Sequence, residues 1–214
     1  MKTDDLIDVL STNFEAADRG RLWRALAGAL TVGGAVAFGA MLVVLGARAD
    51  AIDTARLAFI LTKLLFTLSV IAIATILLIK CARPMAERHK MLLLQVVPFV
   101  AIAIGAVLTI VSVPWLNWGE MIFGKEWLTC LISIPFFAAT PFAALVWAVR
   151  ATGAPTDLAR TGAIVGLLAG GIGAAAYAFH WQDDSLPFVA VWYGATIGLC
   201  TFIGAKFGPW LLRW

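Results

Sequence analysis

The sequence has little charge for its length. Of its 214 residues only 14% are Asp, Glu, Lys or Arg, whereas 62% are hydrophobic and the mean hydropathy is +0.93. A water-soluble domain of this size is nearer a quarter charged and half apolar. One soluble core cannot hide so much apolar surface. The composition therefore excludes a soluble globular protein and indicates a membrane protein.

Cysteines and catalytic motifs are also scarce. Cys81, Cys130 and Cys200 stand far apart with no CxxC pair, which excludes a zinc knuckle and a disulfide framework. No P-loop, GxSxG or HExxH motif is present. We therefore expect no enzyme and no resident cofactor. The first residues are acidic and amphipathic, so no cleavable signal peptide is expected either.

Six apolar segments are long enough to cross a bilayer. A helix needs ~20 residues to cross ~30 Å of hydrocarbon, and an open strand in lipid would leave its amides unpaired. The segments are residues 25–46, 57–79, 92–113, 127–149, 161–179 and 188–208. The predicted fold is all-α: a polytopic bundle of six transmembrane helices formed by residues 23–214, preceded by a soluble segment of residues 1–22.

The basic residues predict the orientation, because cytoplasmic loops are enriched in Lys and Arg. Twelve of them fall on one side of the predicted bundle: Lys2, Arg19, Arg21, Arg24, Lys80, Arg83, Arg88, Lys90, Arg150, Arg160, Lys206 and Arg213. The other side has three: Arg48, Arg56 and Lys125. Both termini are therefore expected to be cytoplasmic.

Glycines spaced four apart predict one helix contact. The fifth span has Gly162, Gly166 and Gly170, while the sixth has the pairs Gly194/Gly198 and Gly204/Gly208. Small residues at this spacing form a smooth stripe that lets two backbones approach closely. We expect the fifth and sixth spans to pack together.

Lys63 is the one basic residue well inside a predicted span. Ionisable residues within membranes are often functional. However, Lys63 lies only ~9 Å from the outer end of its helix, and a lysine side chain can reach the interface from there. Two interpretations stay open: an anchor at the outer lipid interface, or a role in signalling or helix contact.

Cys130 is predicted at the outer end of the fourth span. There, an exposed thiol could be oxidised, bridge to another chain or bind a soft metal, whereas a buried one would be a small apolar residue. His180, Asp183 and Asp184 lie in the last outer loop and with Cys130 could form a mixed metal site. Alternatively, the two acids are solvated or cap the following helix. A metal ion is expected only as a transient signal.

Residues 1–22 contain an amphipathic helix pattern. Its apolar stripe suits a groove on a protein partner, and its acidic residues disfavour binding to an anionic leaflet. It could equally pack on the bundle's own cytoplasmic face. The candidate partner-binding residues are Asp4, Asp5, Leu6, Ile7, Leu10 and Phe14.

Several of these segments resemble one family. They are the opening MKTDDLI, residues 59–63 (FILTK), 82–84 (ARP), Cys130, and the closing pattern from His180-x2-Asp183-Asp184-Ser185 through residues 188–194 to 212–214. Together they resemble NrsF-type anti-sigma factors, six-span proteins of the bacterial inner membrane. The resemblance implies that the chain sequesters an extracytoplasmic-function sigma factor and does not itself bind nucleic acid. Besides the sigma factor, the expected partner is inner-membrane lipid. If the chain forms a homo-oligomer, a second copy of the chain is a further partner.

The family is described as sensing heavy metal or oxidant stress through two outer cysteines. The first matches Cys130, but the second belongs directly after the histidine, where this chain has Trp181. Tryptophan can neither ligate a metal nor form a disulfide. Either Cys130 senses with other ligands or with another chain, or the signal is different.

The resemblance and the residues together predict a two-state bundle. The amino-terminal helix and inner loops hold the sigma factor until a change at the outer ends of spans four and five moves these helices, through kinks at Pro135 and Pro141. A small transporter or channel is the first alternative, but no polar path is evident in the sequence. A thiol oxidoreductase is the second, but it would require an outer cysteine pair.

Overall fold

The computed structural model describes residues 19–46, 54–82, 89–124, 127–180 and 185–213. In this part of the chain six helices are long and apolar enough to cross a membrane, which confirms the predicted all-α bundle. The first five are α2 (Arg19–Val44), α3 (Thr54–Cys81), α4 (His89–Val111), α6 (Trp127–Thr152) and α7 (Leu158–Tyr177). The sixth is composite: α8 (Leu186–Phe188), a π-helical segment η2 (Val189–Tyr193) and α9 (Gly194–Leu211).

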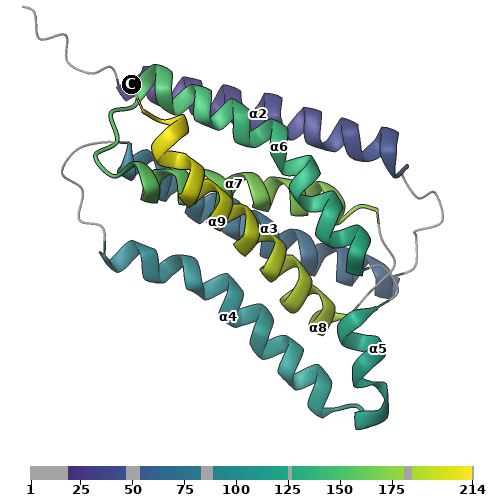
Figure 1. The fold of residues 1–214 in the computed structure, drawn as a ribbon. Helices are drawn as coiled ribbons and strands as arrows, with labels where there is room; N and C mark the ends of the chain where they lie inside the picture. The colour runs from purple at the N-terminus through teal and green to yellow at the C-terminus, as the bar shows by residue number, and fades with distance from the viewer. Residues whose placement is uncertain (1–18, 47–53, 83–88, 125–126, 181–184, 214) are drawn as a thin grey trace, which may run out of the picture.

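The helices run alternately up and down the bundle, so α2 begins and α9 ends at the same end (Figure 1). We call this the basic end, because exposed basic side chains gather there, and the other the opposite end. These side chains are Arg21, Arg24, Arg150, Lys206 and Arg213.

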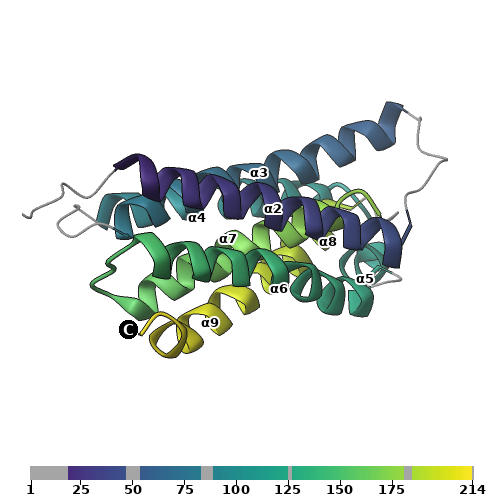
Figure 2. The same ribbon diagram turned by 90° about the horizontal axis from the view of Figure 1, so that it is seen from above.

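Helix α7 is the centre of the bundle. Nearly all its side chains are buried, and it contacts α9, α6, α3 and α2. Helix α4 lies at the edge, against α3 and the start of the composite helix (Figures 1 and 2). Movement of α2, α3, α6 or α9 therefore changes a contact with α7.

The expected contact between the fifth and sixth spans is present. A Cβ built on Gly166 would lie 2.9 Å from the carbonyl carbon of Cys200, and one on Gly162 would lie 2.6 Å from the Cα of Gly208. A Cβ on Gly204 would lie 3.0 Å from the Cα of Gly166. The two backbones thus meet where side chains are missing, as small-residue packing requires.

One part of that prediction is wrong. No heavy atom would come within 4 Å of a Cβ on Gly194 or Gly198, so this pair does not form the contact. At 3.6 residues per turn, Gly198 lies about 120° around the helix from Gly204. Instead Cys200 and Ile197, four and seven residues before Gly204, continue the contact row against Gly170.

Helix α6 also packs closely on α2. A Cβ on Gly33 would lie 2.7 Å from the Cα of Pro141, so glycine is needed at this position. Pro135 and Pro141 both lie inside α6, and prolines are tolerated within transmembrane helices because neighbouring groups satisfy the backbone that they leave unpaired.

Between α4 and α6 the sequence predicts only a loop. The structure has a 3-10 turn, η1 (Trp115–Asn117), followed by a short helix, α5 (Trp118–Phe123). Neither contains a buried residue, and α5 has only six residues, so neither length nor hydropathy could have indicated it.

Candidate functional site

Four buried side chains gather near the opposite end. Lys63 is 3% exposed, Cys130 and Tyr177 are 0% exposed, and Tyr193 is 1% exposed. They come from α3, α6, α7 and η2 respectively. We call these four residues the buried layer.

Helix register places Lys63 and Cys130 at one level. A Cβ on Gly171 of α7 would lie 3.1 Å from Cγ1 of Ile71 in α3, and a Cβ on Gly173 would lie 2.6 Å from the carbonyl oxygen of Ile134 in α6. Both partner helices run antiparallel to α7. Counting ~1.5 Å per residue from these contacts puts both side chains beside the last turn of α7, which contains Tyr177.

Aromatic rings connect this layer to the loops above it. The Tyr177 and Tyr193 ring centroids are 6.1 Å apart in an edge-to-face arrangement, and the His180 ring lies 6.1 Å from Tyr177. His180 Nδ1 is 3.3 Å from the carbonyl oxygen of Gly46, whose φ of 76° lies in the left-handed region that glycine adopts readily. His180 thus bridges the end of α7 and the end of α2.

The start of the sixth span is hydrogen-bonded to α5. The Ser185 hydroxyl caps α8 by accepting a hydrogen bond from the Phe188 N–H, 3.2 Å away, and donates one to the carbonyl oxygen of Met121 at 2.7 Å. Trp192 Nε1 donates to the carbonyl oxygen of Ile122 at 2.8 Å, and the Trp192 ring lies 5.0 Å from that of Trp127. These contacts, which we call the Trp192 contacts, hold α8 and η2 against α5 and the first turn of α6.

The η2 segment is a π-helix, a rare geometry that is frequent at functional sites. Sequence reasoning missed it, although it coincides with the motif at residues 188–194 that carries part of the family resemblance. Its position places Tyr193 in the buried layer and Trp192 against α5. Movement of α5 would therefore act directly on the buried layer.

Of the two interpretations of Cys130, the structure disagrees with the exposed thiol. Cys130 is in the first turn of α6, as predicted for the outer end of the fourth span, but it faces the bundle interior and has no exposed surface. Cys81 and Cys200 are also buried, each at 7% exposure. Hydropathy locates the end of a span but does not indicate which face of the helix meets its neighbours. The structure supports the alternative, a small buried residue.

Lys63 does not face lipid. An anchor at the outer interface requires an exposed side chain, whereas Lys63 is enclosed by protein and its carbonyl oxygen accepts the Thr67 hydroxyl at 2.9 Å. The structure therefore supports the second interpretation, a contact between helices.

The remaining predicted site residues are only partly placed. His180 is half-buried beside Tyr177. Across the residues that the structure describes, no three His, Cys, Asp or Glu side chains gather as a metal site would require. Outside the described residues lie Asp183, Asp184 and Trp181, together with the partner-binding candidates Asp4, Asp5, Leu6, Ile7, Leu10 and Phe14. The metal site thus stays a prediction.

Buried polar side chains are few in the described part of the chain. Besides the two tyrosines they are Lys63 and Thr67, one turn apart on α3, and single residues on three other helices: Gln95 on α4, Thr161 on α7 and Thr196 on α9. Such a distribution lines no polar path from one end of the bundle to the other.

These features define a polytopic membrane protein. Its buried layer is connected to α5 by the hydrogen bonds of Ser185 and Trp192, an arrangement that suits conformational signalling. The chain belongs to the NrsF family, described as a negative regulator of sigma F, whose pattern matches residues 10–214. It is 30% identical over 221 residues to the anti-sigma-F factor NrsF of Caulobacter vibrioides, and the alignment covers 100% of both chains. A probable anti-sigma-F factor NrsF of Azospira oryzae is 27% identical over 214 residues, again covering 100% of both. No solved structure matches significantly.

Proposed function

We propose that this chain sequesters an extracytoplasmic-function sigma factor at the cytoplasmic face of the bacterial inner membrane and releases it on envelope stress. The observation that carries the proposal is the similarity over 100% of its length to a protein named as an anti-sigma-F factor. The helical bundle supports it, because a multi-span protein can connect a signal on one side of a membrane with a partner on the other.

The basic end is the end that faces the cytoplasm in this proposal. Arg21 and Arg24 of α2 and Arg213 after α9 are exposed there, as the positive-inside rule expects. Because α2 begins at Arg19 at this end, the segment of residues 1–18 is attached there as well. Its stripe of Leu6, Ile7, Leu10 and Phe14 then meets the sigma factor, hiding the surface that the factor needs for RNA polymerase or promoter DNA.

The signal acts at the opposite end. A change at α5 reaches the buried layer through the Trp192 contacts. A change at the loop containing His180 reaches it through the contact between the His180 and Tyr177 rings. From the buried layer it passes along α7, whose glycines pack closely against both α6 and α9. A switch from 1:99 to 99:1 in favour of the released state requires ~5.5 kcal/mol. Thiolate–metal bonds at Cys130 could supply that, but only after the layer opens.

Co-purification tests this function. We expect the full-length chain, solubilised in mild detergent, to capture one of the organism's extracytoplasmic-function sigma factors, and a chain lacking residues 2–18 to lose it. A substitution on the apolar stripe, Leu10→Asp, should weaken capture by tenfold or more, because a buried charge replaces an apolar contact. Thr12→Asp, which adds the same charge on the helix face opposite the stripe, is the matched control and should retain capture.

Two results would contradict the proposal. One is that no sigma factor is captured by a chain that is folded and monodisperse in detergent. The other is that the deletion of residues 2–18 captures the factor as well as the parent does, which would remove the amino-terminal segment from the interface.

A further inference from the structure

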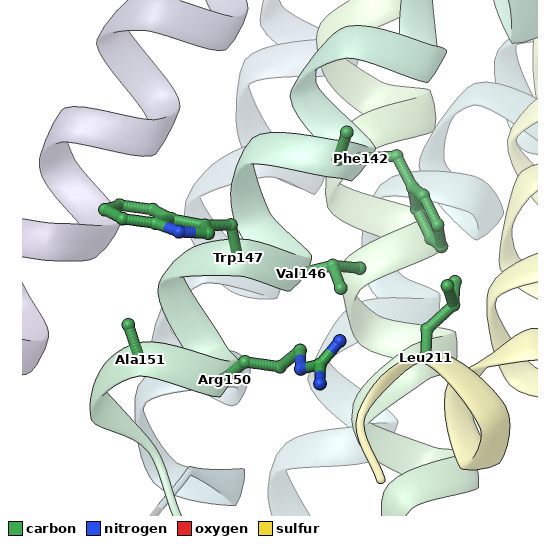
Figure 3. Close-up of a pocket in the computed structure, with 7 residues that line it drawn as sticks. Phe142, Val146, Trp147, Arg150, Ala151 and Leu211 are labelled. Carbon is green, nitrogen blue, oxygen red and sulfur yellow. The ribbon is translucent and has the colours of Figure 1, made fainter. Parts of the chain in front are cut away.

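Helices α6 and α9 both pack on α7 but leave a groove between them. At the basic end this groove forms a cavity of about 480 Å³, whose wall on α6 includes Val146 and Arg150 and whose wall on α9 is Leu211. Figure 3 shows the Arg150 side chain extending from α6 toward Leu211, so its guanidinium lies between α6 and the end of α9.

The groove continues into the middle of the bundle. A second cavity, of about 200 Å³, shares Phe142 with the first and is lined by Pro135 on α6, by Cys200 and Ile203 on α9, and by small residues of α7 at its floor. From Arg150 to Pro135 is fifteen residues of helix, or ~22 Å. Half of the ~30 Å hydrocarbon layer is ~15 Å, so the groove is longer than one leaflet is deep.

The lining has a consistent chemistry along its length. It is apolar except at the basic end, where Arg150 is exposed and forms no ion pair or side-chain hydrogen bond with any residue that the structure describes. Asp157, the acidic side chain described at this end, pairs with Arg160 at 3.6 Å and caps α7. Trp147, which also lines the groove, is 70% exposed, as is typical of aromatic residues at a membrane interface.

We propose that this groove is a binding site for an anionic phospholipid. One acyl chain lies along the apolar part between α6 and α9, and the phosphate accepts hydrogen bonds from the Arg150 guanidinium, whose planar fork matches phosphate oxygens. The occupant must be apolar over most of ~22 Å and carry negative charge at one end. Of the acidic side chains that the structure describes, Glu120 lies at the opposite end and Asp157 already pairs with Arg160, so these helices of a second copy would offer no free anionic group, whereas a phospholipid has this form.

The proposal does not depend on sigma-factor binding. It requires only that the basic end lies at a membrane interface, and it adds a ligand at the helix pair next to α7. Occupancy would hold α6 and α9 at a fixed separation at the end where both approach the cytoplasm.

Native mass spectrometry of the delipidated full-length chain tests the site. With phosphatidylglycerol we expect one saturable adduct that forms at lower lipid concentration than the corresponding phosphatidylcholine adduct. Arg150→Gln should weaken phosphatidylglycerol binding about fivefold, as expected for the loss of one basic contact at ~1 kcal/mol. Arg21→Gln, which removes an exposed arginine from the same end but outside the groove, should bind like the parent.

A second variant tests the apolar part. Ala143→Trp places a bulky ring in the groove and should reduce adduct formation by both lipids, while leaving the helical circular dichroism unchanged. Parent-like binding by Arg150→Gln, or equal weakening by Arg21→Gln, would overturn the proposal. So would a dimer mass that Ala143→Trp abolishes, because it would assign the groove to a second copy of the chain.

Discussion

Gly166→Leu is expected to prevent stable packing of the sixth span on α7. Even a Cβ at this position would lie 2.9 Å from the Cys200 carbonyl carbon and 3.2 Å from the Gly204 Cα. Both contacts are with backbone, which cannot rotate away as a side chain can. Overpacking a core costs ~1–3 kcal/mol even where side chains can adjust, so we expect a larger loss here. The measurement is thermal unfolding in detergent, where the parent's cooperative transition should be lost or strongly lowered.

Gly198→Leu is the matched control. It places the same side chain on α9, in the Gly194/Gly198 pair, where no atom of a neighbouring element lies within 4 Å of a Cβ. We expect its transition to coincide with that of the parent. If Gly166→Leu unfolds like Gly198→Leu, the glycine contact between α7 and α9 is not what holds these spans together.

Cys130→Trp is expected to release the sigma factor without any stimulus. Cys130 has no exposed surface, so an indole in its place must push α6 away from its neighbours or displace Tyr177 and Tyr193. An overpacking energy of ~1–3 kcal/mol shifts a two-state equilibrium by ~5–150-fold. Transcription from a promoter of the captured sigma factor should rise toward the level of a strain that lacks the chain.

The control for this variant is Ser112→Trp, which adds the same ring at an exposed position of the same end and should leave the promoter repressed. Immunoblots of the membrane fraction must show both variants at parent levels, since loss of the protein would also release the factor. Full repression by a correctly inserted Cys130→Trp variant would show that the buried layer is not coupled to the basic end.

The fold could be largely predicted from the sequence, because lipid imposes strict rules on composition and length. Each predicted span overlaps an observed helix; for example, residues 127–149 correspond to Trp127–Thr152. What hydropathy could not supply was the face of each helix. Gly194/Gly198 and Gly204/Gly208 have identical spacing, but helical phase directs only the second pair toward α7.

Of the four residues of the buried layer, Lys63 and Cys130 were identified from the sequence, although their environment was not, and Tyr177 and Tyr193 were missed. Lys63 and Cys130 stand out in the sequence as an ion within a span and an outer cysteine, yet their common level depends on how α3 and α6 are each registered on α7. That register is set by close contacts between residues distant in the chain. The π-helical η2 segment was equally hidden, because the α5 carbonyl that accepts its tertiary hydrogen bond belongs to a helix too short to be predicted.

The account depends most on the two ends of the bundle facing different compartments. Cysteine labelling in intact cells measures this, because the three native cysteines are buried and provide a low background. Ser112→Cys is exposed at the opposite end, and Ala154→Cys is exposed between α6 and α7 at the basic end. A membrane-impermeant maleimide should label Ser112→Cys in intact spheroplasts and Ala154→Cys only after lysis. The reverse pattern would place the basic end outside the cell, where it could not hold a sigma factor.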